Sequence, residues 1–430
     1  MNAIIINPPP AQWKELTRRP QINSKDLDET VSGIIKTVQQ NGDKAVRNYS
    51  LQFHGFAPDS LWVSAAEIEE ASKKIDDELK EAILLAKKNI ELFHLQQTEP
   101  VKKVETSAGV ICWRKSVPVE KTGLYIPGGS APLFSTLLML AIPAKIAGCQ
   151  NIMVATPANE NGQVAEAVLF VAGILGIKDI YKSGGAQAIA AMAYGTETVH
   201  KVDKIFGPGN QYVTCAKKLV SIDGVSIDML AGPSELAVYA DESSVPEFIA
   251  ADLLSQAEHG ADSQVILVAA SQEIIEKVVG EIYKQITLLA RKEIIEKSLL
   301  NMRLLVMEET EDAFDFLNEY APEHLIIASE QAMLLSGFVK NAGSVFLGNL
   351  SPESAGDYAS GTNHSLPTNG TAKTFSGVSV DSFVKKISFQ HINKEGIKNI
   401  GPAVEKMAAA ERLDAHKMAV TIRLKNKKTD

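Results

Sequence analysis

Cysteine is scarce in this chain of 430 residues, which has only Cys112, Cys149 and Cys215. The three form no Cys-x-x-Cys pair, and their odd number leaves at least one thiol unpaired. This pattern favours a reducing cytoplasm over a disulfide framework, and it does not resemble a set of zinc ligands. We therefore expect a cytoplasmic protein without a disulfide framework.

Long apolar segments are also missing. The longest apolar run, residues 167–177, contains two glycines and is far shorter than the roughly 20 residues that cross a bilayer. The first seven residues, Met-Asn-Ala-Ile-Ile-Ile-Asn, are followed by three prolines, so the basic start and apolar stretch of a signal peptide are not present. We expect neither export nor a membrane span.

An excess of positive charge is lacking as well. The formal net charge is -9, and the basic residues are scattered apart from a short group in residues 423–428. A negative chain repels a phosphate backbone, so we expect no nucleic-acid partner. Hydrophobic residues make up 45% and charged residues 22% of the chain, which is typical of a folded globular protein.

Two parts of the chain alternate short apolar runs with helical patterns. The first part predicts strands at residues 124–126, 151–156, 179–182 and 204–206, with helices between them. The second part predicts strands at residues 235–239, 264–269, 304–307 and 324–328, again separated by helices. Consecutive βαβ units of this kind predict parallel sheets.

The predicted fold class is therefore α/β, with two Rossmann-like parallel-sheet domains and helical N-terminal and C-terminal extensions. Residues 26–96 have mostly helical patterns and are expected to pack beside the second sheet, and the pattern after residue 379 is again helical. The predicted division has four parts: an N-terminal extension (1–25), a first α/β domain (26–120 together with 235–378), an inserted Rossmann-like domain (121–234) and a small helical C-terminal domain (379–430).

One candidate metal-binding segment is Ser-Gln-Ala-Glu-His-Gly-Ala-Asp at residues 255–262. Gln256 and His259 are three residues apart at the end of a predicted helix, so their side chains share one face and could hold a metal. A histidine at a helix C-terminus is also favoured by the helix dipole alone. The pair therefore needs further partners to be interpreted as a site.

Further polar candidates lie in two later segments. Asp357 and His364 belong to a glycine-rich polar loop, where both a carboxylate and an imidazole are more than a turn requires. Glu411 and His416 are five residues apart on a predicted helix, an offset that does not place them on one face, so solvent exposure is the simpler interpretation. Zinc accepts imidazole nitrogen and carboxylate oxygen, but spacing alone does not bring these segments together.

The adjacent pair Glu323 and His324 follows Pro322 at a predicted strand start. Neighbouring side chains point to opposite faces of a strand unless the backbone is irregular. A proton-transfer pair is one hypothesis for these two residues.

Three glycine-containing loops, at residues 125–130, 183–187 and 207–212, follow predicted strands and precede helices. Free backbone N–H groups at such positions can bind an anion, for example the phosphates of a nucleotide. The third glycine of the dinucleotide fingerprint is replaced by Tyr212, so the motif is weak. Tight βα turns would explain the glycines equally well, and both interpretations stay open.

Eight segments, in this order, resemble those of the histidinol dehydrogenase family. They are Tyr125-Ile-Pro-Gly-Gly, Gly184-Gly-Ala-Gln187, Phe206-Gly-Pro-Gly-Asn210, Ala231-Gly-Pro-Ser-Glu235, residues 255–261, Ala321-Pro-Glu-His324, Ala355-Gly-Asp-Tyr358 and residues 411–416. Each segment is unspecific alone, but together they extend over nearly the whole chain.

The resemblance implies a zinc-dependent enzyme that oxidises L-histidinol through L-histidinaldehyde to L-histidine with two NAD, the last steps of histidine biosynthesis. It implies that zinc is bound by Gln256, His259, Asp357 and His416, and that the substrate completes the shell. The implied catalytic pair is Glu323 and His324. The other implied contacts are Ser234, His364 and Glu411 for the substrate, and Tyr125, Gln187 and Asn210 for NAD. The substrate would also contact the four zinc ligands and His324.

The resemblance further implies a homodimer with shared active sites, in which the tail of one subunit completes the site of the other. The residue types suit the chemistry, because a histidine can accept the hydroxyl proton as hydride leaves. Glu323 could act as the base when water adds to the aldehyde.

Three other functions are weighed against this one. A related zinc- and NAD-dependent dehydrogenase of another small polar alcohol could use the same metal and cofactor residues, although Glu411 and His364 argue against it. A metallohydrolase would not need an NAD domain, and a non-catalytic binding protein would need neither base nor metal.

Overall fold

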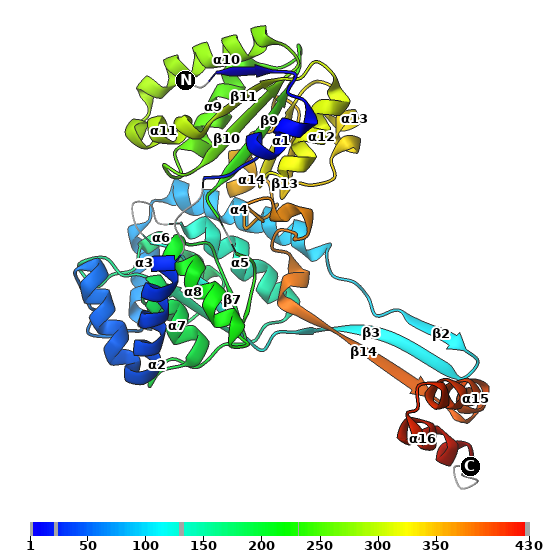
Figure 1. The fold of residues 1–430 in the computed structure, drawn as a ribbon. Coiled ribbons are helices and arrows are strands. Elements are labelled where there is room, and N and C mark those ends of the chain that lie inside the picture. Colours follow the sequence, from blue (N-terminus) through cyan, green and yellow to red (C-terminus); the bar gives the residue numbers. More distant parts are fainter. Residues whose placement is uncertain (1–2, 21–24, 129–132, 231, 426–430) are drawn as a thin grey trace.

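Two parallel sheets organise the computed structural model, which describes residues 3–20, 25–128, 133–230 and 232–425 (Figure 1). The α/β class expected from the alternating pattern is confirmed. A third, antiparallel sheet forms an arm that projects from the two-sheet body.

The five-stranded sheet has the order β6-β5-β4-β7-β8, and all its strands are parallel. Its strands are β4 (Lys121–Tyr125), β5 (Asn151–Thr156), β6 (Asp179–Lys182), β7 (Lys204–Phe206) and β8 (Ser226–Ile227). The connecting helices are α5 (Phe134–Ala147), α6 (Glu166–Ile174), α7 (Gly185–Tyr194) and α8 (Gln211–Ile222). Counted from β4 the order is 3-2-1-4-5, as in a Rossmann fold, so β4 and β7 flank the switch point where ligands usually bind.

The six-stranded sheet repeats this order and adds one strand, giving β1-β11-β10-β9-β12-β13, all parallel. Its strands are β1 (Ile4–Ile6), β9 (Glu235–Ala240), β10 (Gln264–Ala269), β11 (Arg303–Val306), β12 (His324–Ala328) and β13 (Ser344–Leu347). Its helices are α1 (Pro10–Leu16), α9 (Pro246–Ala257), α10 (Gln272–Gln285), α11 (Lys292–Ser298), α12 (Thr310–Tyr320), α13 (Ala332–Leu335) and α14 (Glu353–Tyr358). The N-terminal residues expected as an extension therefore include an edge strand of this sheet.

The central strands of both sheets are buried on both faces, which explains why they appear in the sequence as continuous apolar runs. Every residue of β9, β10 and β12 is buried. Helix α5 is also buried over most of its length and ends at Gly148, whose φ of 94° is the left-handed conformation that glycine adopts readily.

The N-terminal helices α2 (Lys25–His54), α3 (Ala65–Lys74) and α4 (Asp77–Leu95) pack against the helices that flank the five-stranded sheet. Helix α2 contacts α7 and α8, α3 contacts α6, and α4 contacts α5. The expectation that residues 26–96 pack beside the second sheet is therefore wrong. An amphipathic pattern shows that one helix face is buried, but it does not say against which sheet.

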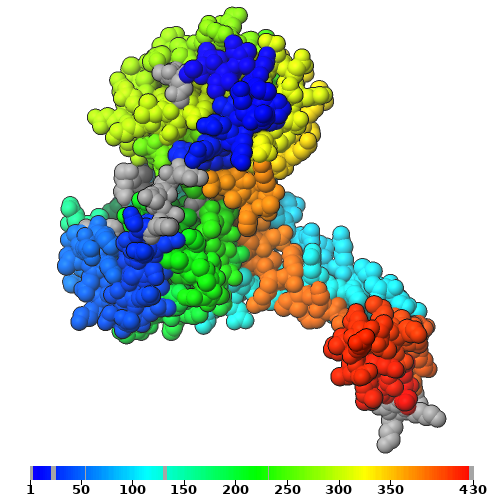
Figure 2. Space-filling view, viewed as in Figure 1, coloured from blue at the N-terminus to red at the C-terminus, as the bar shows by residue number. Residues whose placement is uncertain are grey.

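The arm consists of β2 (Lys103–Ser107), β3 (Val110–Pro118) and β14 (Val384–Ile392), with α15 (Lys394–Ala410) and α16 (Asp414–Lys425) at its tip. Strand β14 pairs antiparallel with β3 over nine residues, and the rings of Phe389 and Trp113 stack at 5.4 Å. The expectation of helix throughout residues 379–430 is wrong for β14, because pairing with the distant strand β3 decides its conformation. Figure 2 shows the arm and its helical tip standing clear of the body.

Among the described helices, none is long and apolar enough to cross a membrane.

Candidate active site

Glu323 and His324 lie at the amino end of the six-stranded sheet. Strand β12 begins at His324, which is paired with Leu236 near the start of β9. The turn before it contains Ala321, which has a left-handed φ of 51°. Glu323 thus precedes the regular strand, and its carboxylate accepts a hydrogen bond of 2.9 Å from the Glu235 N–H. The Nδ1 atom of His324 lies 3.2 Å from the Glu235 carbonyl oxygen.

Three carboxylates surround the His324 ring. Nδ1 lies 3.7 Å from Glu323 and 3.6 Å from Glu353, and Nε2 lies 3.7 Å from Asp357. Burial lowers the pKa of His324, but these carboxylates outweigh burial and raise it above its ordinary value. Burial raises the pKa of Glu323 to about 8. At neutral pH these shifts favour the protonated forms of His324 and Glu323.

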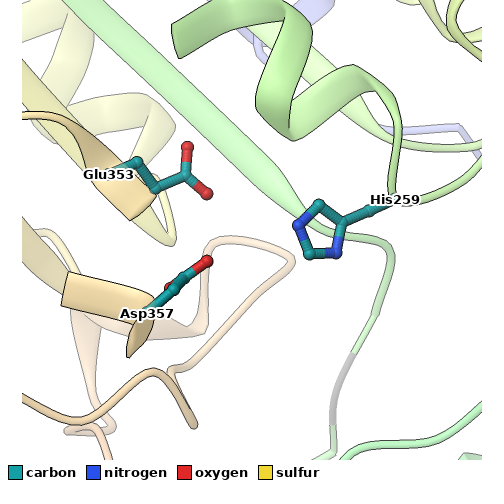
Figure 3. Close-up of side chains that lie close together, drawn as sticks. All are labelled: His259, Glu353 and Asp357. Carbon is teal, nitrogen blue, oxygen red and sulfur yellow. The ribbon is translucent and has the colours of Figure 1, made fainter. Parts of the chain in front are cut away.

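A group that could hold a metal lies beside His324. The ligand atoms of His259, Glu353 and Asp357 lie within 4.8 Å of one another. His259 follows α9, while the two carboxylates lie one turn apart on α14 and face the imidazole (Figure 3). Burial opposes ionisation of Asp357, but the neighbouring imidazoles, first that of His324, hold its pKa below the ordinary value. An ionised carboxylate and an imidazole are both zinc ligands.

Gln256 is buried in the last turn of α9. With its amide placed to satisfy both polar atoms, the nitrogen donates to the Glu353 carboxylate and the oxygen accepts from the Glu235 N–H at 3.2 Å. Gln256 is therefore in contact with the predicted site, although it faces Glu353 rather than His259.

Glu353 is a site residue that the sequence analysis missed. It is 2% exposed and contacts both Gln256 and His324. Its offset of four residues from Asp357 was an available signal, because such residues share one helix face.

His364 connects the site to the five-stranded sheet. Its Nδ1 donates to the Asp357 carbonyl oxygen at 3.0 Å, and its Nε2 lies 3.3 Å from the Thr136 hydroxyl in the first turn of α5. Since α5 follows β4, the carboxyl edge of the five-stranded sheet faces the amino edge of the six-stranded sheet here. Ser234, which directly precedes β9, lies at the same amino edge.

The predicted NAD contacts lie at the carboxyl edge of the five-stranded sheet. Tyr125 ends β4, Gln187 lies in the first turn of α7, and Asn210 caps α8. Gln187 is fully buried, and neither atom of its amide has a hydrogen-bond partner among the described residues. Residues 129–132 of the first glycine loop lie outside the described part of the chain.

Gly207 has a structural role at this edge. Its φ is 126°, and a Cβ atom there would lie 2.1 Å from the Tyr125 carbonyl oxygen. This glycine therefore permits the close approach of two strand ends, which supports the tight-turn interpretation of its loop without excluding a nucleotide beside it.

Glu411 and His416 are not brought to the site within one chain. Glu411 caps the end of α15, His416 belongs to α16, and both are exposed. Figure 1 places α16 at the tip of the arm, far from α14, which lies in the body between the two parallel-sheet parts.

Comparison with known proteins decides the family. The family model for histidinol dehydrogenase matches residues 17–424. The chain belongs to the histidinol dehydrogenase family. A histidinol dehydrogenase from Bacteroides fragilis is 58% identical over 98% of both chains, and one from Mannheimia succiniciproducens is 51% identical over 96% of this chain and 98% of its own. The crystal structure of a histidinol dehydrogenase from Elizabethkingia anophelis is 54% identical and superposes with a TM-score of 0.96 over 98% of both chains.

Family membership makes this chain an enzyme of the oxidoreductase class. The family resemblance expected from the eight sequence segments is confirmed.

Proposed function

We propose that this enzyme oxidises L-histidinol through L-histidinaldehyde to L-histidine, using zinc and two NAD, as the last steps of histidine biosynthesis in the cytoplasm. The observation that carries the proposal is the buried Glu323 and His324 pair beside the His259, Glu353 and Asp357 cluster, in a chain of this family.

The residues fit a zinc site. His259 and Asp357 offer a nitrogen and a carboxylate oxygen to one point, and Gln256 adds an amide from the adjoining helix turn. Zinc, when bound, supplies a charge that orients the imidazole and amino nitrogens of the substrate. Gln256 must turn its amide oxygen away from Glu235 to act as a ligand, and Glu353 remains as its hydrogen-bond acceptor.

His324 suits the removal of the hydroxyl proton. The neighbouring carboxylates favour the protonated ring, and zinc bound at Asp357 would offset their charge and favour the neutral ring. A carbonyl oxygen only accepts hydrogen bonds, so in the neutral ring Nδ1 carries the proton and faces Glu235. Nε2 then has a free lone pair, and it is a buried atom without a hydrogen-bond partner. We propose that Nε2 accepts the substrate hydroxyl proton as hydride passes to NAD.

Glu323 suits the second oxidation. Its carboxylate is held by the Glu235 N–H, and its raised pKa makes the ionised carboxylate a stronger base toward water. We propose that it activates the water that adds to the aldehyde, after which a second NAD accepts the next hydride. The unpartnered amide of Gln187 supports a cofactor at the carboxyl edge of the neighbouring sheet, with Tyr125 and Asn210 beside it.

We propose that the enzyme is a homodimer with shared sites. Glu411 and His416 lie on an arm that does not reach the site of its own chain, and we assign them to the substrate and zinc of the partner. The exposed apolar side chains at the tip, Met407, Leu413, Met418 and Ile422, support burial against another subunit.

Incubation with histidinol and NAD tests the function. Formation of two NADH for each histidine produced is the expected result. Turnover of other small polar alcohols in preference to histidinol would instead identify the enzyme as a related zinc- and NAD-dependent dehydrogenase, and absence of NADH would reject both.

A further inference from the structure

A buried ion pair lies directly behind the catalytic pair. Arg19 donates from Nε to Glu235 Oε1 and from Nη2 to Glu235 Oε2, both at 2.9 Å. The two side chains are 12% and 1% exposed. A guanidinium that donates to both oxygens of a carboxylate fixes the orientation of the carboxylate as well as its distance, whereas a lysine ammonium fixes only the distance.

The same guanidinium holds the turn that precedes the catalytic pair. Nη2 of Arg19 also donates to the Tyr320 carbonyl oxygen at 2.6 Å and lies 3.4 Å from that of Ala321. Arg19 stacks over the Tyr320 ring at 4.0 Å. Ala321 has the left-handed φ of 51°, a conformation that costs energy in residues other than glycine and persists only when its surroundings hold it.

The main chain of Glu235, whose side chain is held by Arg19, contacts both Glu323 and His324. Its N–H donates to Glu323 at 2.9 Å, and its carbonyl oxygen lies 3.2 Å from His324 Nδ1. Its carboxylate also accepts from the Asn369 N–H at 2.7 Å, in the segment that follows His364. Glu235 thus links the start of β9, the proposed catalytic pair and the segment that follows His364.

We propose that Arg19 is a positioning residue for catalysis: it fixes Glu323 and His324 by clamping Glu235 and the Ala321 turn. A buried ion pair adds little net stability compared with an apolar pair of the same size, because desolvation offsets the attraction. The two-pronged geometry of the Arg19–Glu235 pair is better explained by a role in placing the Glu323 and His324 side chains. The inference rests on the proposed oxidation of histidinol.

Arg19→Lys is the first test, since lysine keeps the positive charge but cannot donate the two parallel hydrogen bonds to the Glu235 carboxylate. A catalytic group displaced by about 1 Å can cost about 100-fold in rate, so we expect kcat to fall by about that factor. The zinc content and the KM for histidinol are expected to stay near those of the wild type, because Arg19 does not contact Gln256, His259 or Asp357 in the described structure. Histidinol and supplied histidinaldehyde should be affected equally, because the Ala321 turn carries both catalytic residues.

Chemical rescue separates positioning from folding. Arg19 lines a pocket of about 400 Å³, together with Gln264 and Arg303, so a guanidinium ion can reach the space left by Arg19→Gly. Low concentrations of guanidinium should restore part of kcat in this variant and should not raise that of the wild type, whereas urea should restore none.

Arg303→Lys is the matched control. Arg303 lines the same pocket and, among the described residues, donates to the carbonyl oxygens of Asn301 and Met302, so the kcat of this variant should not change.

Wild-type kcat in Arg19→Lys would overturn the proposal. So would loss of folded protein in both Arg19 variants, or a folded Arg19→Gly that guanidinium does not rescue, because Arg19 would then act on folding alone. Failure of the wild type to oxidise histidinol would reject the proposed function instead.

Discussion

Glu323 and His324 are adjacent in sequence, but their surroundings suit them to different steps. The Glu323 carboxylate is fixed by a main-chain N–H, while Nε2 of His324 is buried and has no hydrogen-bond partner in the described part of the chain. A base fixed by its surroundings and an imidazole with a free lone pair are both competent to accept protons. The structure therefore supports a division of labour that can be tested one residue at a time.

Glu323→Gln should slow the oxidation of supplied histidinaldehyde by about 100-fold or more, because an amide cannot act as a base. The first hydride transfer from histidinol should slow much less. His324→Ala should slow both. Single-turnover NADH formation from each substrate measures the two steps, and equal losses for Glu323→Gln would remove its special role.

Metal removal tests the ligand set. Treatment with a chelator should abolish turnover and added zinc should restore it, because the substrate is expected to bind through the metal. Gln256→Ala and His259→Ala should lower zinc content and activity together, whereas His200→Ala, which changes an exposed histidine before β7, should lower neither. Full activity in zinc-free protein would contradict the site.

At the scale of elements, the two sheets use opposite edges. The predicted cofactor residues follow β4, β6 and β7 at their carboxyl ends, as is usual for parallel sheets. The proposed catalytic pair lies at the amino ends of β9 and β12. At the carboxyl ends of these two strands, where the strand order of the six-stranded sheet reverses, the Ser329 hydroxyl donates to the Asp241 carboxylate at 2.5 Å. The usual ligand-binding position of this sheet is therefore spanned by a hydrogen bond within the protein. The proposed reaction site thus lies where the carboxyl edge of one sheet meets the amino edge of the other.

The close approach of β4 and β7 depends on Gly207, and Gly207→Ala should lower the free energy of unfolding by about 3 kcal/mol. The added methyl group would meet the Tyr125 carbonyl oxygen, and the positive φ adds strain. Urea unfolding measures the change.

Gly33→Ala is the control for this substitution. Gly33 is exposed within α2, and its Cβ would meet no atom within 4 Å. That change should raise stability by up to about 1 kcal/mol. If the two substitutions had equal effects, the close strand approach would not explain Gly207.

At the scale of the whole molecule, the arm separates Glu411 and His416 from the rest of the predicted site. In a two-fold symmetric dimer each subunit contributes the same residues to its partner, so an arm that completes the partner's site gives each dimer two shared sites. Mixing inactive subunits tests whether the arm has this role.

His324→Ala and His416→Ala should each be nearly inactive alone. Unfolding and refolding them together at equal concentration makes about half of the dimers mixed, and each mixed dimer has one site free of both lesions. About a quarter of the wild-type activity should therefore return.

The combination of His324→Ala with His259→Ala is the control, since both residues lie in the body and every site keeps a lesion. No activity should return there. Recovery no greater than this control in the first mixture would show that His416 serves its own chain.

Sequence alone determined the α/β class, the central strands of both sheets and the family, because strand periodicity and the order of short motifs are local properties of the chain. It also predicted Gln256, His259, Glu323, His324 and Asp357, which the structure brings together. Only the tertiary structure decided that helices α2–α4 pack on the helices of the five-stranded sheet and that residues 384–392 form a strand, since both depend on partners far along the chain. It likewise revealed Arg19 and Glu353, because a buried charge is recognised by the groups that surround it, and those groups come from segments that are distant in sequence.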